Sequence, residues 1–324
     1  MQAQLFHSAE NPLPDQTGKR IVSGIFAARD GVSLRYAIFK SAERIAKGTV
    51  VLLHGRNESI EKYFETIRHL NERGLWVATF DWRGQGISQG RPRNPAAGYV
   101  KRFADYENDL DDFLRQIVLP DTRLPFFLMA HSTGGLIALS AAPRLANRIE
   151  RMVLLAPFIE IGGRKLPPGG IRALTSLLSV TGFGTTIVGR VDPDRPFAGN
   201  PLTHDELRFR RNMKLAEQAP ELLPTSPTAR WISEAIATMR KVRRPEHLAS
   251  IEIPTLILAA GADTIVPIRA IEELGSYFRA ARVITIDRAR HELLQESDLY
   301  REQALAAIDA FIPGSLSPEI DGGL

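Results

Sequence analysis

The chain has 324 residues, 44% hydrophobic and 24% charged, which is enough for one large hydrophobic core and an inserted subdomain. It contains no cysteine, which excludes disulfides, thiolate metal sites and a cysteine nucleophile, and suits a reducing cytosol. Its formal net charge of +4 is too small and too dispersed to predict nucleic-acid binding.

The chain opens with a predicted antiparallel pair of strands. Ile21–Ala28 and Ser33–Phe39 are β-rich runs that flank Asp30-Gly31, a dipeptide that favours a tight hairpin turn. Short, nearly all-apolar runs follow, and continuous apolarity is typical of strands buried on both faces. These runs are Thr49–Leu53, Trp76–Phe80, Pro125–Ala130, Met152–Ala156, Thr255–Ala260 and Val283–Ile286.

Segments with helical spacing lie between the apolar runs. They are Ile60–Glu72, Phe103–Ile117, Thr133–Ala146, Arg269–Phe278 and Asp298–Phe311. The alternation predicts an α/β protein with a mostly parallel eight-stranded sheet, right-handed crossovers and helices on both faces. In such folds the active residues lie at the carboxyl ends of the strands.

One region, residues 157–250, interrupts the alternation because it contains no run typical of a buried strand. We predict that it is a helical cap or lid inserted between the sixth and seventh strands. The core then comprises residues 1–156 and 251–324. Within the core, we expect flexible tails at about 1–19 and 313–324.

The predicted cap has two compositional features. Ile171–Val191 is apolar and contains glycines, which suits a pliable wall for an acyl chain or simple packing onto the core. Asp205–Ala219 and Thr228–Val242 have the spacing of amphipathic helices. The cap holds 14 Lys and Arg against 9 Asp and Glu, a balance expected of a solvated surface or of a cationic face near anionic lipid. Four of these basic residues are close in sequence: Arg208, Arg210, Arg211 and Lys214.

Ser132 is the candidate nucleophile. It lies in Ala130-His131-Ser132-Thr133-Gly134-Gly135, after a predicted strand and before a predicted helix. This strand-to-helix turn is the context of a nucleophile elbow, where small residues two positions on either side let strand and helix pass closely. Ala130 stands at the first small position, where the strict pattern has glycine. A turn serine that merely caps the helix is the alternative.

A serine hydroxyl needs a base to remove its proton and an acid to orient that base. Among seven histidines, His291 is the candidate base because it follows the last predicted strand, in a loop before the final helix. Asp263 directly follows the penultimate strand and is the candidate acid, with Asp287 as its rival. The resulting chain order of Ser, Asp and His is that of α/β-hydrolases.

The other histidines have structural interpretations. His7 belongs to the predicted N-terminal tail, His69 to a helix, and His204 and His247 to the cap. His131 adjoins the candidate nucleophile but should point away from it. His54 and Asp81 are expected to support loops.

Acyl transfer also requires hydrogen-bond donors for the developing oxyanion. The N–H of Thr133, next after the candidate nucleophile, is one expected donor. The other is the N–H of Arg56, in the loop His54-Gly55-Arg56-Asn57-Glu58 that follows a predicted strand. This role needs the main chain of Arg56 only.

Several motifs together resemble bacterial lysophospholipases and the related monoacylglycerol lipases, within the serine aminopeptidase S33-like hydrolases. The likeness spans roughly residues 20–312. It rests on the loop from Leu53 to Ser59 with Lys62-Tyr63, on Asp81-Trp82-Arg83-Gly84-Gln85-Gly86-Ile87-Ser88, on the serine motif and on Ala289-Arg290-His291-Glu292. In the cap, Asn200-Pro201-Leu202-Thr203, Arg210-Arg211-Asn212, Pro227-Thr228 and Trp231 are similar to the lysophospholipase branch.

The resemblance implies an α/β-hydrolase fold and the triad Ser132, Asp263 and His291. It further implies a carboxylic-ester hydrolase for lipids with a single acyl chain, without metal or organic cofactor. Thr133 replaces the methionine usual after the nucleophile in this group, and Arg56 is larger than the residue many relatives have there. Both differences concern the acyl-chain and headgroup preference rather than the mechanism.

Three other functions fit parts of the sequence. The same triad would serve an aminopeptidase or a general short-chain esterase. A non-enzymatic binding protein of this fold would be expected to have lost a triad residue, whereas all three are present here. An aminopeptidase should hold the substrate ammonium with acidic cap residues, whereas this cap is basic. No signal peptide or apolar membrane span is evident, so we expect a cytosolic protein, with transient contact between the cap and the inner membrane surface as an extension.

Overall fold

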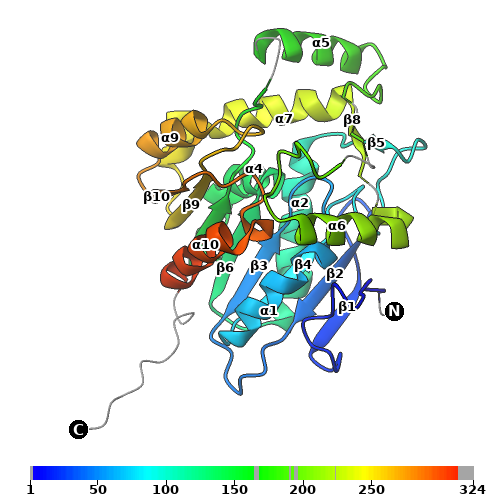
Figure 1. Ribbon diagram of the computed structural model, residues 1–324. Coiled ribbons are helices and arrows are strands. Elements are labelled where there is room, and N and C mark those ends of the chain that lie inside the picture. Colours follow the sequence, from blue (N-terminus) through cyan, green and yellow to red (C-terminus); the bar gives the residue numbers. More distant parts are fainter. Residues whose placement is uncertain (1–2, 164–167, 190, 193–195, 223, 313–324) are drawn as a thin grey trace.

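The computed structural model describes residues 3–163, 168–189, 191–192, 196–222 and 224–312. Eight strands form the central sheet in the order β1-β2-β4-β3-β6-β7-β9-β10 (Figure 1). Their bounds are β1 Ile21–Ala27, β2 Ser33–Phe39, β3 Thr49–Leu53, β4 Trp76–Phe80, β6 Phe126–His131, β7 Arg151–Leu155, β9 Thr255–Ala260 and β10 Ala281–Ile286. The pairs β1-β2 and β2-β4 are antiparallel and the others are parallel. The predicted mostly parallel eight-stranded sheet is confirmed.

The apolar character of the central strands follows from their burial. Every residue of β3, β6 and β9 is buried, because helices cover both faces of the sheet. The edge strand β10 instead exposes Arg282, Ile284 and Thr285. Continuous apolarity thus correctly indicated the central strands, but the run Val283–Ile286 belongs to an edge strand and is not buried on both faces, because no further strand pairs with β10 in this sheet.

Helices cover the sheet on both faces. One face carries α1 (Phe64–Glu72), which follows the 3₁₀ turn Ile60–Tyr63, and α10 (Asp298–Phe311). The other face carries α2 (Phe103–Phe113), α4 (Thr133–Ala141) and α9 (Ile268–Tyr277). The predicted helix Phe103–Ile117 continues past α2 as a π-helical turn, Leu114–Val118, and the short α3 (Leu119–Asp121). Further 3₁₀ turns are Ala142–Arg144, Pro220–Leu222 and Leu293–Gln295.

The segment between β7 and β9 contains four helices within its described residues. They are α5 (Pro168–Val180), α6 (Glu206–Gln218), α7 (Ala229–Val242) and α8 (Pro245–Ala249). Figure 1 shows α5 and α7 beyond one end of the sheet, and α6 near α1 and α10. One short strand, β8 (Ser226–Pro227), pairs with β5 (Ala97–Gly98) outside the central sheet. Two residues are too few to produce a periodic pattern, so the sequence did not indicate this pair.

Helix α7 joins the main core instead of lying loosely above it. Trp231, Ala235, Met239 and Val242 are buried in the same hydrophobic cluster as α2 and α4. Thr228 begins the helix by accepting a hydrogen bond from the Trp231 N–H with its side chain. The segment 157–250 is thus anchored through α7.

The N-terminal segment differs from the flexible tail expected for residues 1–19. The Asn11 side chain donates a hydrogen bond to the Glu61 carbonyl at 3.0 Å, and Asn11 is buried. Leu5 and Leu13 pack against the cluster under α1. Residues 3–19 therefore lie on the core, because two apolar side chains and polar contacts hold them there. The other expected tail, 313–324, falls outside the described residues.

Beneath this segment, a fully buried ion triad joins three elements. The Arg35 guanidinium contacts Glu61 at 2.6 Å and Asp81 at 2.6 Å, and all three side chains are inaccessible to solvent. Asp81 also accepts hydrogen bonds from the N–H groups of Ile60 and Ile87. Asp81 thus holds two loops together, as expected for a residue with a structural role.

Candidate active site

Ser132 lies on the sharp turn between β6 and α4. Its backbone has φ 50° and ψ −115°, a conformation that costs free energy for a residue with a side chain. The Ser132 N–H donates to the Leu155 carbonyl at 3.0 Å, which fixes the turn to the neighbouring strand. A Cβ on Gly134 would lie 2.7 Å from the Leu53 carbonyl oxygen, so this position requires glycine. Ala130 is completely buried, and its methyl group fits the first small position.

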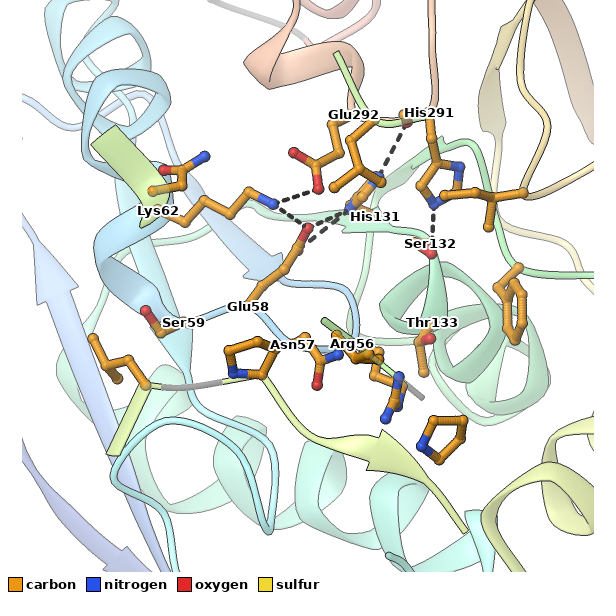
Figure 2. A pocket seen from close by; sticks show the side chains of 18 of the residues that line it. Arg56, Asn57, Glu58, Ser59, Lys62, His131, Ser132, Thr133, His291 and Glu292 are labelled. Atoms are coloured by element: carbon orange, nitrogen blue, oxygen red, sulfur yellow. Dashed lines mark hydrogen bonds and ion pairs between the residues drawn. The ribbon is translucent and has the colours of Figure 1, made fainter. Parts of the chain in front are cut away.

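The structure brings the three candidate catalytic side chains together from distant points of the chain. Nε2 of His291 lies 2.9 Å from Oγ of Ser132, and Nδ1 of His291 lies 2.6 Å from Oδ2 of Asp263 (Figure 2 shows the Ser132–His291 contact). The other carboxylate oxygen of Asp263 accepts hydrogen bonds from the N–H groups of Ile265 and Val266. These bonds hold the carboxylate toward His291, an arrangement that can deprotonate a serine hydroxyl.

The rival acid lies elsewhere. The Asp287 side chain is 89% exposed, and its ion-pair partner is Arg288 rather than His291. The structure thus favours Asp263, since the end of β10 leaves Asp287 pointing to solvent.

Of the other described histidines, His7 is exposed, and the rest have partners other than Ser132. His69 pairs with Asp309, His204 pairs with Glu296, and Nε2 of His247 lies 2.9 Å from the Leu139 carbonyl. The His54 ring contacts the Gly55 carbonyl and the Trp82 N–H, and burial lowers its pKa despite the nearby Asp81. A neutral, fully buried imidazole in this position supports the loop.

Side chains hold the loop after β3 next to Ser132 by binding the main-chain N–H groups on either side of Arg56. The Gly55 N–H donates to Glu58 at 2.5 Å, and the Asn57 N–H donates to Gln85 at 2.6 Å. Thr133 is the first residue of α4, where a main-chain N–H has no partner within the helix. Arg56 and Thr133, the two expected oxyanion donors, both line the cavity that contains Ser132. Sequence reasoning assigned no role to Gln85, although it stands in a motif that carries the resemblance, because its role depends on a contact between two loops.

A cluster of buried charges lies beside these groups (Figure 2). The Lys62 ammonium contacts Glu58 at 2.8 Å and Glu292 at 2.7 Å. Burial opposes the charge on Glu58, but Lys62 and His131 hold the pKa of this carboxyl well below its usual range. Burial would lower the pKa of His131, yet the Glu58 carboxylate beside it raises the pKa above that of a free histidine.

His131 connects this cluster to the candidate base. Its Nδ1 faces Glu58 and its Nε2 lies 3.3 Å from the His291 carbonyl oxygen. The ring therefore points away from Ser132, as expected. Sequence reasoning assigned no role to Glu58, Lys62 or Glu292, although all three stand in the motifs that carry the resemblance.

The cavity has a volume of about 370 Å³ and two chemically distinct parts. The charged cluster lines the polar part, and Arg56 lies apart from it, with its guanidinium over the Trp231 ring. The apolar part is lined by Phe158, Leu202, Phe209, Met213, Leu215, Leu222, Trp231, Ile232 and Ile265. Apolar residues of α6 and α7 thus form a wall suited to a hydrocarbon chain.

The expectation that Ile171–Val191 forms this wall is wrong for all but its last residue. Of that range, the described part of the cavity lining includes only Val191. Helix α5 packs on the outer side of α7, and Leu174, Leu177, Val180 and Phe183 are exposed. An apolar, glycine-bearing composition is compatible with either position, so composition could not decide between them.

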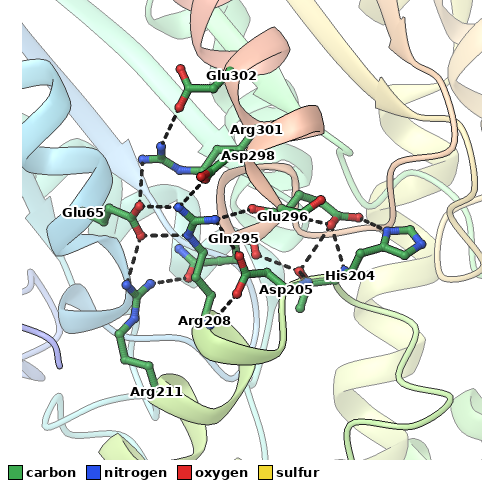
Figure 3. A network of polar contacts seen from close by, with 12 residues as sticks. Glu65, His204, Asp205, Arg208, Arg211, Gln295, Glu296, Asp298, Arg301 and Glu302 are labelled. Atoms are coloured by element: carbon green, nitrogen blue, oxygen red, sulfur yellow. Dashed lines mark hydrogen bonds and ion pairs between the residues drawn. The ribbon is translucent and has the colours of Figure 1, made fainter.

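The basic residues of α6 do not form an unpaired cationic face, because they have acidic partners. Arg208 contacts Glu65, Asp205 and Asp298, and Arg211 contacts Glu65 (Figure 3). Two further pairs are Arg210 with Glu206 and Lys214 with Glu10. Arg208 and Arg211 tether α6 to α1, and their charges are largely compensated.

Comparisons with known proteins identify the group. Residues 44–298 match the family described as serine aminopeptidase, S33. The chain belongs to this family. It is 31% identical to lysophospholipase L2 of Escherichia coli over 90% of this chain and 88% of that protein. It is 27% identical to a probable lysophospholipase L2 of Haemophilus influenzae over 93% and 94% of the two chains.

Solved structures agree on the fold. A soluble variant of monoglyceride lipase from Saccharomyces cerevisiae matches with a TM-score of 0.73 at 20% identity, covering 91% of this chain and 95% of that one. A carboxyl esterase from Bacillus coagulans matches with a TM-score of 0.72 at 21% identity, covering 91% and 98%. The protein is therefore a hydrolase with the α/β-hydrolase fold, which confirms the resemblance found in its motifs.

No cluster of three or more His, Asp or Glu side chains among the described residues is arranged to hold a metal ion. None of their helices combines the length and the apolar character that crossing a bilayer requires.

Proposed function

We propose that this hydrolase cleaves carboxylic esters of lipids with a single acyl chain, as a lysophospholipase or monoacylglycerol lipase does. Ser132 is the proposed nucleophile, His291 the general base and Asp263 the acid that orients it. The observation that carries the proposal is the hydrogen-bonded chain from Ser132 through His291 to Asp263, at the edge of a cavity with an apolar wall.

The proposed reaction has two halves. His291 takes the proton of Ser132 as Oγ attacks the ester carbonyl, and the N–H groups of Arg56 and Thr133 stabilise the oxyanion. The imidazolium then gives its proton to the leaving alcohol, which leaves the acyl group on Ser132. Water, deprotonated by the same imidazole, then attacks the acyl-enzyme, and the imidazolium returns that proton to Oγ of Ser132 as the fatty acid is released. The Asp263 carboxylate stabilises the imidazolium in both halves.

The lipid part of the proposal rests on the cavity and on the relatives. Phe158, Trp231 and Ile232 offer an apolar surface close to the candidate nucleophile. The alignments with the relatives named lysophospholipase L2 cover about nine-tenths of this chain. We also propose transient contact of the cap with a membrane surface, now through the exposed apolar residues of α5 rather than the paired arginines of α6.

An aminopeptidase is the second candidate because the family carries that description. Such an enzyme needs a carboxylate to hold the substrate ammonium. The described acidic residues that line the cavity are Glu58, Asp192 and Glu292. Glu58 and Glu292 are already paired with Lys62, and Asp192 is not free of partners either. This pairing favours the ester substrate.

The proposal is tested by labelling the purified protein with a fluorophosphonate and then assaying lysophospholipids, monoacylglycerols, p-nitrophenyl esters and amino-acid amides. We expect labelling that Ser132→Ala abolishes, and the highest kcat/KM on long-chain lysophospholipids or monoacylglycerols. Labelling without cleavage of any acyl ester, together with rapid cleavage of amino-acid amides, would replace this proposal with the aminopeptidase.

A further inference from the structure

Arg56 is a cation in the cavity without an acidic partner. Its Nη2 donates to the Thr225 carbonyl, and its guanidinium carbon lies 5.0 Å from the centre of the Trp231 ring. Among the described residues, no carboxylate forms an ion pair with Arg56. Burial lowers the pKa of Arg56 to about 10, which leaves the guanidinium charged at neutral pH.

Lys62, the other cation of the cavity, provides a direct contrast. It has two carboxylate partners, Glu58 and Glu292, and together they satisfy its charge. Figure 2 shows that the Arg56 side chain extends away from this cluster, on the side of Thr133. Arg56 is partly buried, so its charge has lost part of its hydration without gaining a carboxylate partner. A cation in this state is well suited to bind an anionic part of a ligand.

The position of Arg56 limits which anion it could bind. Its main chain belongs to the loop beside Ser132, and its side chain lines the same cavity. In a lysophospholipid the phosphate is separated from the acyl ester by the glycerol backbone alone, whereas a monoacylglycerol has a hydroxyl there. A guanidinium is a planar fork of donors that matches two phosphate oxygens. With Nη2 on Thr225, the Nε and Nη1 donors have no hydrogen-bond partner among the described residues.

We propose that the Arg56 side chain binds the phosphate of a lysophospholipid headgroup and thereby makes the enzyme prefer phosphate-bearing substrates over neutral monoacylglycerols. This inference rests on the proposed ester hydrolase function and specifies its substrate class. The main-chain N–H and the side chain of Arg56 then have separate tasks, one at the oxyanion and one at the headgroup.

A purely structural role is the competing explanation, because the bond to Thr225 also ties the loop to the cap segment. Arg91 provides a matched control. Its guanidinium donates in the same way to a cap carbonyl, that of Glu221, but Arg91 is not among the residues that line the cavity. Loss of a tether alone should affect both substrates in either variant.

The test compares Arg56→Met, Arg56→Lys and Arg91→Met on a lysophosphatidylethanolamine and a monoacylglycerol with the same acyl chain. For Arg56→Met we expect the ratio of kcat/KM between the two substrates to fall about 10-fold to 100-fold, mainly through the KM for the lysophospholipid. Arg56→Lys should give an intermediate ratio, since it keeps the charge and loses the fork. Arg91→Met should leave the ratio within about twofold of wild type.

A second measurement separates a lipid headgroup from free phosphate. Glycerol 3-phosphate should inhibit monoacylglycerol hydrolysis competitively, about tenfold more weakly in Arg56→Met than in wild type, while inorganic phosphate should inhibit less because it lacks the glycerol. Equal losses on both substrates with unchanged inhibition would overturn the role of Arg56 and leave the ester hydrolase standing. A wild-type enzyme that cleaves no acyl ester would instead defeat the proposed function itself.

Discussion

The choice between two aspartates tests the candidate triad at the scale of single residues. Asp263→Asn should lower kcat about 10⁴-fold with the fold retained, because an amide would stabilise the wrong imidazole tautomer. Ser132→Ala and His291→Ala should cost at least as much. Steady-state kinetics with a p-nitrophenyl ester, and circular dichroism as a check on folding, measure these effects.

Asp287→Asn is the matched control, since its carboxylate is exposed at the end of β10. We expect its kcat to stay within about twofold of wild type. A crippled Asp287→Asn beside a nearly active Asp263→Asn would reverse the assignment of the acid.

Much of the candidate site could be predicted from the sequence, because its residues directly follow strands that have a recognisable sequence pattern. Ser132 and Asp263 each follow a buried apolar run, and His291 follows the partly exposed edge strand β10. The carboxyl ends of these parallel strands meet at one edge of the sheet. The partners of Lys62 and the contact of Gln85 with the Asn57 N–H could not be predicted in the same way. They depend on side-chain directions in loops, for which no periodic pattern exists.

At the scale of elements, Glu65 on α1 is the acceptor that holds α6. Its carboxylate binds Arg208 and Arg211, and although burial opposes the charge, these arginines with Arg301 lower its pKa to about 2 (Figure 3). Because the folded-state pKa lies below the unfolded value, this stabilisation is present above about pH 4.5 and is lost as the pH falls toward 2.

Glu65→Gln should therefore lower the free energy of unfolding at pH 7 by about 1–3 kcal/mol, a range reduced for the 24% exposure of the Glu65 side chain. The difference from wild type should shrink between pH 4.5 and pH 3. Urea unfolding at several pH values measures it. Glu206→Gln, which removes the exposed partner of Arg210, should change stability by less than about 0.5 kcal/mol. A Glu65 effect that persists unchanged at pH 3 would contradict the ionic tether.

Helix α5 is the element through which membrane contact is proposed. Leu174, Leu177 and Val180 are 53%, 58% and 79% exposed, and an amphipathic helix can bury such a face in a lipid interface. Leu174→Ser with Leu177→Ser should lower binding to anionic lipid vesicles about tenfold in a sedimentation assay, without a change in kcat on a soluble ester. Leu299→Ser, an exposed change on α10, serves as control. Equal binding of both variants would remove α5 from the membrane contact.

The sequence predicted the elements of the cap better than their positions. The predicted ends of the amphipathic helices agree with those of α6 and α7 to within one or two residues, because helix ends depend on local periodicity. The sides that they face depend on ion pairs between residues more than 80 positions apart, such as Arg208 with Asp298 and Glu65. Composition alone therefore could not show that α6 and α7, rather than α5, line the cavity.

At the scale of the whole molecule, the segment between β7 and β9 and the rest of the fold line the site together. Phe158 follows β7, Phe209 and Met213 lie on α6, and Trp231 lies on α7, and all four line the cavity around Ser132. Because α7 is also part of the main hydrophobic core, the apolar wall near it is rigidly attached. The selection of substrates by acyl-chain length should therefore depend on cavity residues from both parts of the fold.

Long acyl chains should be preferred if this wall holds the substrate. From acetyl to dodecanoyl esters of one alcohol, each added methylene should contribute up to about 0.8 kcal/mol, or roughly fourfold in kcat/KM, until the apolar part is filled. Measurements stay below the micelle concentration of each ester, so that interfacial effects do not add to the trend. Ile232→Asp, which places a charge in the wall, should flatten the series, while Leu299→Asp on the surface of α10 should not. A flat series in the wild-type enzyme would remove the lipid assignment and leave a general esterase, because the apolar wall would then contribute nothing to binding the acyl chain.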